Sequence, residues 1–271
     1  MNGEQIDAVI LKKNAFSESN EVVTMYSRQA GKVRGIAKAV KRLQSKLAFG
    51  LQNLFYSKID LVDARKRLTI IGAKPVNTFK YLRENKSAVH AGLFGAELVL
   101  KSTADEQPNE ALFDYFVQFL EHLDLAAKNS APGPHLCAYF FSWQVLALTG
   151  YAVNAEACTI CGRTLVSFAS VGAASPANPT ASQTFFSNRK SGFLCGDCAG
   201  KTADARQVSP EVFAAIQAAI AGPEDFESQD LMFASRAPQN QSSQKSELAA
   251  LSNSFIEHIL ERDLKSARYL V

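Results

Sequence analysis

The sequence lacks the marks of a membrane protein, of a secreted protein and of an ATP-driven enzyme. No stretch approaches the roughly 18 apolar residues that a membrane-spanning helix needs. The N-terminus, MNGEQIDAVILKK, has acidic residues before its apolar run and no small-residue cleavage site. There is no G-x-x-x-x-G-K-[S/T], G-x-G-x-x-G, H-E-x-x-H or G-x-S-x-G motif. We therefore expect a cytoplasmic protein without a membrane partner, in which thiols stay reduced.

Acidic residues are scarce in the first 80 residues. There, 15 Lys and Arg stand against 6 Asp and Glu, a net charge of +9, whereas the rest of the chain has 14 basic and 20 acidic residues, a net charge of −6. This asymmetry indicates that the basic part binds nucleic acid, with a solvated basic face as the alternative. Few carboxylates also weaken the case for a metal-dependent nuclease, because such enzymes need clustered carboxylates to hold their ions.

Short apolar runs with β-branched residues predict five strands in residues 1–80. We expect them at residues 6–11, 21–26, 32–37, 51–62 and 68–71, with Pro75 ending the fifth. Five short strands favour a small closed barrel, and the OB-fold is the natural candidate for it. An SH3-like barrel fits this pattern almost as well.

Helical periodicity replaces the strand pattern after Pro75. It predicts helices at residues 87–103, 109–125 and 136–152, another from Ser209, and a last one at residues 246–264. Residues 222–245 are polar and are expected to form a loop. The predicted organisation is an OB-fold domain at residues 1–80 and an all-α domain at residues 81–271, with an inserted module at about 158–200.

The inserted module contains four of the five cysteines, in two C-x-x-C pairs. These are Cys158-Thr-Ile-Cys161 and Cys195-Gly-Asp-Cys198. In a reducing compartment such pairs indicate a metal more than disulfides, and four thiolates suit tetrahedral Zn²⁺. A site with four protein ligands leaves no open position, so the predicted zinc is structural. Cys137 lies in an apolar helix and is expected in the core.

Basic residues concentrate at the third strand and after it, with no acidic residue among them. These are Lys32, Arg34, Lys38, Lys41, Arg42 and Lys46. In a strand, Lys32, Arg34 and Lys38 would share one face. A second cluster, Arg65-Lys66-Arg67, lies at the next hairpin turn. Such strips bind phosphates by releasing counterions, so all nine are predicted to contact DNA. The aromatics of this region, Phe16, Phe49, Phe55 and Tyr56, are expected mostly in the core.

Several segments resemble the RecO family of bacterial recombination mediators. Residues 7–40 are similar to its opening, at Phe16-Ser17-Glu18, Ala30-Gly31-Lys32 and Ala37-Lys38-Ala39. The segment LQSKLAFGLQNL at 43–54 and the tail HILERDLKSARYL at 258–270 are also similar to family motifs. The second cysteine pair, with SGFLC at 191–195, resembles the zinc-bearing members.

The resemblance implies an N-terminal OB-fold, a helical domain and an inserted zinc module. It also implies a non-catalytic role in recombinational repair in a bacterial cytoplasm, close to the nucleoid. Members bind single- and double-stranded DNA, anneal complementary strands, and load the recombinase onto DNA coated by single-strand-binding protein. Their partners are RecR and the C-terminal tail of the single-strand-binding protein. A nucleic-acid-processing enzyme such as a nuclease, and a protein-interaction adaptor, remain as alternatives.

Overall fold

The computed structural model describes residues 3–42, 45–63, 67–129, 133–165, 183–221 and 241–270. The chain separates into two compact units. The first comprises Met1–His135 with Arg268–Val271, and the second comprises Leu136–Ala267. The predicted domain boundary at residue 80 lies inside the first unit, where the strands end and the helices begin, and it stays a prediction.

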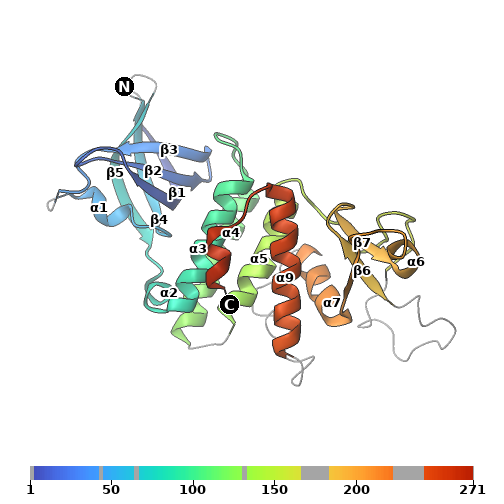
Figure 1. Ribbon diagram of the computed structural model, residues 1–271. Helices are drawn as coiled ribbons and strands as arrows, with labels where there is room; N and C mark the ends of the chain where they lie inside the picture. Colours follow the sequence, from blue (N-terminus) through green and yellow to red (C-terminus); the bar gives the residue numbers. More distant parts are fainter. Residues whose placement is uncertain are drawn as a thin grey trace. The chain divides into compact units, whose positions relative to one another are not determined.

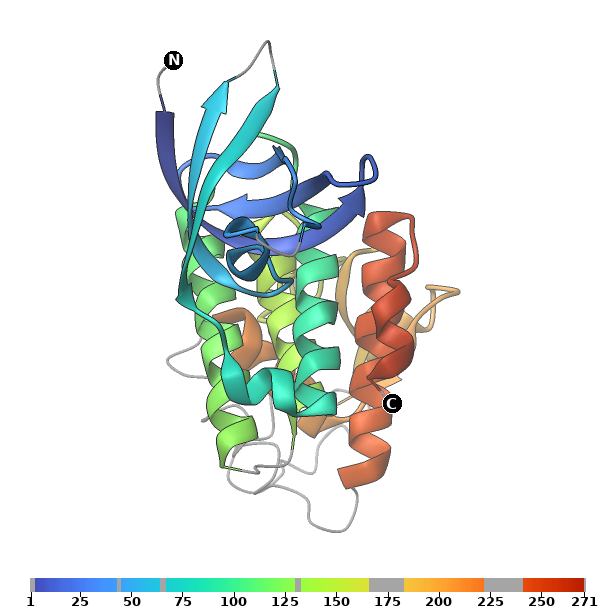
Figure 2. The ribbon, with the colours of Figure 1, turned by 90° about the vertical axis from the view of Figure 1, so that its left-hand side faces the viewer.

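The first unit opens with a closed five-stranded barrel (Figures 1 and 2). Its strands are β1 (Gly3–Ala15), β2 (Glu21–Ser27), β3 (Gly31–Ala37), β4 (Tyr56–Asp63) and β5 (Leu68–Asn77). Around the barrel the order is β1-β2-β3-β5-β4, and β3 pairs with β5 in parallel. A short helix, α1 (Leu47–Gly50), lies between β3 and β4. This order is that of an OB-fold, which decides between the two predicted barrels.

Every second side chain along the strands points into the barrel, and these apolar side chains form its core. Inward positions such as Ile6, Val23, Met25 and Ile59 are fully buried and form one apolar cluster. Each such side chain contributes about 1.5–3 kcal/mol by leaving water. The positions between them face outward, and on β3 these are Lys32, Arg34 and Ile36, of which Arg34 is exposed.

Three strands have other bounds than predicted, and the first of them, β1, spans Gly3–Ala15 and is longer at both ends than the predicted residues 6–11. The fourth strand begins at Tyr56 and not at residue 51, because residues 47–50 form α1. The fifth strand does not end at Pro75. That proline pairs with Ser57 beside a register shift, where the ladder is already irregular and the missing N–H matters less.

Three helices complete the first unit: α2 (Lys80–Glu84), α3 (Lys86–Ser102) and α4 (Glu110–Lys128). The apolar face of α4, formed by residues at helical spacing such as Leu112, Phe116 and Phe119, is buried. Asn85 and Asn109 cap α3 and α4 by accepting from the N–H groups of Ala88 and Leu112. The five-residue helix α2 was not predicted, since it is too short to show a period.

The second unit contains the helices α5 (Pro134–Leu148, from Leu136 on), α7 (Pro210–Ala221) and α9 (Gln241–Leu260) and the turn η3 (Lys265–Tyr269, up to Ala267). A small sheet of order β7-β6-β8 is formed by β6 (Thr184–Ser187), β7 (Gly192–Cys195) and β8 (Arg206–Val208), with α6 (Gly196–Ala199) after β7. Residues 241–245, expected in a loop, begin α9. The remainder of that expected loop lies outside the described residues. No described helix is long and apolar enough to cross a membrane.

Candidate metal centre and nucleic-acid interface

The first cysteine pair forms a tight turn. The N–H of Gly162 donates to the carbonyl of Cys158 at 2.9 Å, and the N–H of Cys158 donates to the carbonyl of Arg163 at 2.8 Å. Gly162 has φ +71°, a left-handed conformation that other residues adopt only with strain. The glycine that follows the first pair therefore has the backbone freedom that this tight turn requires.

The second pair lies at the end of the β6–β7 hairpin. Cys195 ends β7, and Cys198 lies in α6. Gly196 is part of this helical turn and, unlike Gly162, does not have a positive φ. Thr159 joins the two turns, since its N–H and hydroxyl both donate to the carbonyl of Phe193, at 2.9 and 3.2 Å. A side chain at Gly192 would overlap Thr159 and push the turns apart.

The hairpin brings all four predicted ligands together. The four Sγ atoms lie within 4.8 Å of one another, and those of Cys161 and Cys195 are 3.7 Å apart. Cys158 and Cys195 are buried, while Cys161 is exposed. Among the described residues, this is the cluster of side chains that could hold a metal ion, and no group of carboxylates converges in that way.

The electrostatics of the cluster suit a cation. Burial alone would raise the pKa of the Cys158 thiol, but N–H groups of Cys161, Cys195 and Ile160 donate to its sulfur and lower the pKa to about 6. Burial, together with hydrogen bonds to the other three cysteines, raises the pKa of Cys198 to about 12. Four thiolates this close together would repel one another. A divalent cation removes that conflict, because it compensates the negative charge of the thiolates.

Buried aromatic side chains connect the strands of the cysteine module to the helices α5 and α7. Phe186 of β6 and Phe193 of β7 are buried and pack edge to face at 5.0 Å between centroids. Phe193 contacts Phe213 of α7 at 4.8 Å, and Phe186 contacts Trp143 of α5 at 5.7 Å. The Trp143 indole N–H donates to Ser252 of α9 at 2.9 Å. The hairpin that positions Cys195 is therefore part of the core of the second unit.

The first two predicted DNA contacts have intramolecular partners. Lys32 is only 8% exposed, and its ammonium group donates to the carbonyls of Leu100 (2.9 Å) and Thr103. It also pairs with Asp105 at 3.3 Å. Arg34 pairs with the same carboxylate at 3.1 Å but keeps its side chain 60% exposed. Lys32 thus ties the barrel to the end of α3, and we remove it from the set of phosphate contacts.

The other predicted cations of this strip are exposed. Lys38, Lys41 and Arg42 follow β3 in a turn, and Lys46 precedes α1. Hydrogen bonds join this turn to the β1–β2 loop, where the Lys41 N–H donates to the Ser19 carbonyl at 3.3 Å. Among the described residues, the structure shows no carboxylate paired with these four cations.

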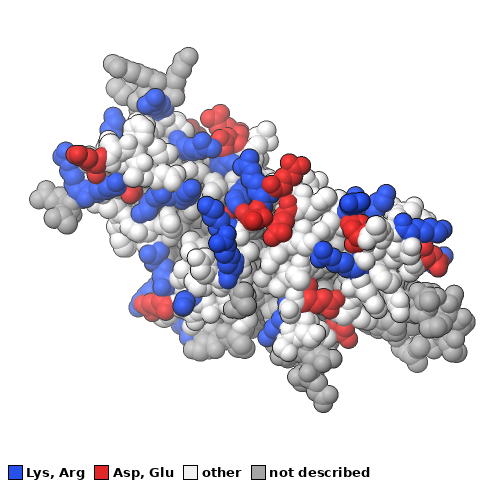
Figure 3. Space-filling model, viewed as in Figure 1, with Lys and Arg blue, Asp and Glu red and all other residues white. Residues whose placement is uncertain are grey.

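The second predicted cluster is only partly described. Arg67 is exposed at the start of β5, and Arg65 and Lys66 lie outside the described residues. We use the term basic surface for the six exposed cations around β3: Arg34, Lys38, Lys41, Arg42, Lys46 and Arg67. On the face drawn in Figure 3, Lys and Arg side chains outnumber Asp and Glu over the barrel.

Two aromatic residues near the basic surface were wrongly expected in the core. Phe16 is 53% exposed in the β1–β2 loop, and Phe49 is 63% exposed on α1. Only Phe55 is buried among the four aromatics considered, and Tyr56 is half-buried. Phe49 packs edge to face with Phe55, with the ring centroids 5.6 Å apart. Phe16 lies in the loop between β1 and β2, where side chains do not alternate between the core and the solvent as they do in a strand. Its exposure could therefore have been inferred from the sequence.

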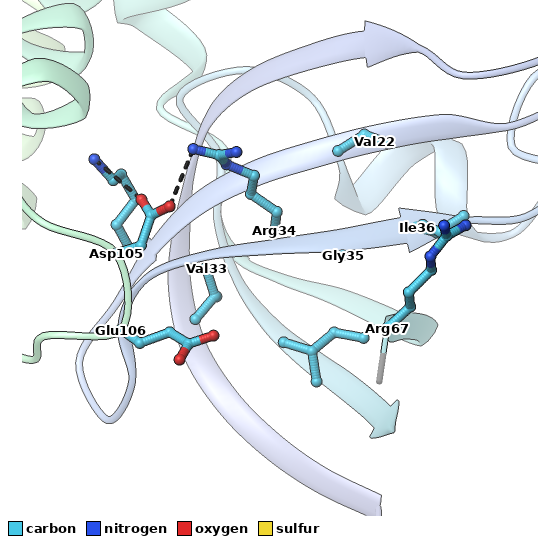
Figure 4. Close-up of a pocket in the computed structure, with 10 residues that line it drawn as sticks. Val22, Val33, Arg34, Gly35, Ile36, Arg67, Asp105 and Glu106 are labelled. Atoms are coloured by element: carbon cyan, nitrogen blue, oxygen red, sulfur yellow. Dashed lines mark hydrogen bonds and ion pairs between the residues drawn. The ribbon is translucent and has the colours of Figure 1, made fainter. Parts of the chain in front are cut away.

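A hollow of about 260 Å³ lies on the outer face of β3 (Figure 4). Its apolar lining includes Val22, Ile36 and Leu68, and Arg34 and Arg67 lie at its margin. Asp105 and Glu106 enter from the segment after α3, and the Glu106 N–H donates to the Lys32 carbonyl at 2.9 Å.

Comparisons with known proteins identify the family. The family model described as Recombination protein O N terminal matches residues 1–79, and that described as Recombination protein O C terminal matches residues 83–268. The chain belongs to the RecO family. The predicted family is therefore confirmed, over nearly the full length of the chain.

Relatives named DNA repair protein RecO agree with this assignment. The one from Pelotomaculum thermopropionicum is 27% identical over 264 residues, which are 97% of this chain and 92% of that protein. A Dehalococcoides mccartyi relative (strain BAV1) is 26% identical over 70% of this chain and 68% of its own. A Clostridium novyi relative is 28% identical over 58% of this chain and 59% of its own.

RecO membership gives the chain a role in recombinational DNA repair. The family is one of repair mediators and not of catalytic enzymes, so the predicted non-catalytic class is confirmed and the nuclease alternative is set aside. The four-cysteine cluster and the OB-like barrel agree with the predicted architecture.

Proposed function

We propose that the chain binds single- and double-stranded DNA through the basic surface of its barrel. The observation that carries this proposal is a group of exposed cations, mostly without carboxylate partners among the described residues, next to the exposed rings of Phe16 and Phe49. Cations that no carboxylate neutralises are available to phosphates, and binding then releases counterions from the DNA. We include Arg65 and Lys66 in the surface on the basis of the sequence.

Single strands gain a further contribution in this proposal. Their unpaired bases can stack on Phe16 and Phe49, whereas the bases of a duplex are already stacked on one another. Contacts to phosphates and ring faces carry little sequence information, so we expect little sequence preference. A surface of this kind can bind two strands whatever their base sequence, and annealing of complementary strands requires such binding.

We further propose that annealing and recombinase loading on DNA coated by single-strand-binding protein follow from this surface. The proposed protein partners are RecR and the acidic, hydrophobic C-terminal tail of the single-strand-binding protein. The resemblance to the family supports these partners. We also propose association with the bacterial nucleoid, as a consequence of DNA binding.

Zinc has a structural role in this proposal. Cys158, Cys161, Cys195 and Cys198 supply four thiolates to one Zn²⁺, which leaves no position for a substrate. The bound ion would join the two turns and hold the β6–β7 hairpin on the aromatic core of the second unit. It stabilises the fold and does not contact DNA.

Titration of a fluorescent single-stranded oligonucleotide at two salt concentrations tests the DNA proposal. We expect tight binding at low salt and a steep loss at the higher salt, since several phosphates are neutralised. Absence of binding at low salt would remove the DNA function and favour the adaptor alternative. The same titration with a peptide that carries the acidic tail tests the protein partner separately.

A further inference from the structure

The hollow beside β3 differs chemically from the rest of the basic surface. Its lining combines the cations Lys32, Arg34 and Arg67 with the carboxylates of Asp105 and Glu106, and Lys32 and Arg34 both pair with Asp105. A phosphate that approached Arg34 would meet Asp105, which already pairs with that guanidinium at 3.1 Å. The charge at this end therefore disfavours a second anion, although Lys38, Lys41 and Arg42 nearby attract one.

The floor of the hollow is apolar. Val22 and Ile36 are cross-strand partners on β2 and β3 and project outward, since their neighbours Val23 and Ala37 fill the barrel core. The Arg67 side chain lines the same hollow and, in Figure 4, extends toward the end of β3 that carries Ile36. A guanidinium plane beside an aliphatic floor is a surface on which a flat, uncharged ring stacks.

The size of the hollow and its fixed walls restrict the occupant. Its volume of about 260 Å³ is below the roughly 300–1,000 Å³ of pockets that enclose drug-sized ligands. It can take one ring system but not a folded peptide segment. The acidic wall is held in place, because Lys32 binds the carbonyls of Leu100 and Thr103, and the Glu106 N–H donates back to Lys32.

From this chemistry we infer that the hollow is a subsite for one unpaired base of a bound single strand. The base lies on Val22 and Ile36 and under Arg67, while the flanking phosphates stay on Lys38, Lys41 and Arg42. Asp105 acts as a positioning residue that holds Arg34 at the margin. The inference rests on the proposed DNA function, because the subsite is filled only when a strand lies on the basic surface.

The test compares two strands that differ only in their bases. One is a thymidine oligonucleotide, and the other has the same length and phosphates but abasic residues throughout. We expect the unaltered protein to bind the thymidine strand at least tenfold more tightly. Phe16 and Phe49 also contribute to this ratio, so variants of the hollow must isolate its own part.

Two variants change the hollow without changing the charge. Arg67→Lys keeps the positive charge but removes the stacking plane, at an exposed position where folding is not at risk. Ile36→Gln makes the floor polar, and Ile71→Gln, at a 59% exposed isoleucine outside the hollow, is its matched control. We expect Arg67→Lys and Ile36→Gln to lower the thymidine-to-abasic ratio at least threefold. Affinity for the abasic strand should stay the same in Ile36→Gln, since Ile36 is not one of the cations of the basic surface, and Ile71→Gln should change neither quantity.

The outcomes separate the two proposals. If the unaltered protein binds both strands, steeply dependent on salt, and Arg67→Lys leaves the ratio unchanged, the DNA function stands and the base subsite is wrong. If the unaltered protein binds neither strand at low salt, the DNA function fails and the subsite fails with it.

Discussion

The cysteine cluster and the basic surface are built in opposite ways. The cluster brings four side chains within 4.8 Å, braced by Thr159, by Gly192 and by buried aromatic rings. The basic surface spreads its cations over a strand, a turn and two loops, and most of them are exposed. A tetrahedral Zn²⁺ site holds its four ligands in one fixed geometry, whereas exposed and flexible side chains are sufficient to contact the phosphates of a flexible single strand. One changed ligand should therefore destroy the cluster, but several changed cations are needed to remove the surface.

The largest effect is expected from Cys195→Ser. With three thiolates left the site should lose its zinc, and the second unit should unfold at lower temperature, since structural zinc can contribute on the order of 10 kcal/mol to folding. Metal analysis and thermal unfolding measure both effects. The control is Cys137→Ala, because Cys137 is buried in α5 outside the cluster and its loss should leave one zinc per chain. One zinc per chain in Cys195→Ser would contradict the four-thiolate site.

Charge reversal of the basic turn is expected to have the next largest effect. Replacing Lys38, Lys41 and Arg42 together by Glu should weaken DNA binding about 100-fold or more at low salt, since attraction becomes repulsion. The fold should persist, because all three side chains are exposed. The control makes the same charge change at Lys190, Lys201 and Arg206, exposed cations of the second unit. Equal losses in both triple variants would mean that net charge, and not this surface, determines binding.

A smaller effect is expected from the exposed rings. Phe16→Ala and Phe49→Ala should each weaken single-strand binding by roughly 5- to 100-fold, as expected for base stacking on an aromatic side chain. Duplex binding should stay nearly constant, because paired bases are not available for stacking. Tyr151→Ala, at a 43% exposed aromatic of the second unit, is the control. Equal losses for single strands and duplexes would exclude stacking.

The smallest effect on DNA binding is expected at Lys32. Lys32→Gln should destabilise the first unit by about 1–3 kcal/mol, because the partly buried carbonyls of Leu100 and Thr103 lose their charged donor. Its DNA affinity should change less than twofold. Lys38→Gln should do the reverse, with unchanged stability and weaker binding. Chemical denaturation measures the stability of the two variants, and the oligonucleotide titration measures their DNA affinity. A large loss of affinity in Lys32→Gln would mean that Lys32 contacts DNA after all.

The sequence predicted the cysteine cluster better than the basic surface, and the reason is physical. A C-x-x-C pair places two ligands on one turn. The sequence then left open only how the two pairs come together, which the β6–β7 hairpin achieves. The fate of a surface lysine depends on residues far along the chain. Lys32 is occupied by carbonyls of residues 100 and 103, about 70 positions away, which no local pattern shows.

The fold was predictable where periodicity was long. The strands of the barrel and the long helices α3 and α4 appear close to their predicted positions. Elements of three to five residues, such as α1, α2 and β8, were not predicted, because they are shorter than the pattern that would reveal them. Their formation depends on tertiary packing, as with β6, whose residue Phe186 contacts Trp143.

The salt dependence of single-strand binding tests the central claim most directly. The logarithm of the association constant falls linearly with the logarithm of salt concentration, and each phosphate of a single strand that the protein neutralises adds about 0.7 to the steepness of that line. We would measure this slope for the unaltered protein and for the variant with Lys38, Lys41 and Arg42 all changed to Gln. If these three side chains bind phosphates, the slope should become shallower by about 2. Parallel lines for the two proteins would contradict the claim that DNA binds on this surface of the barrel.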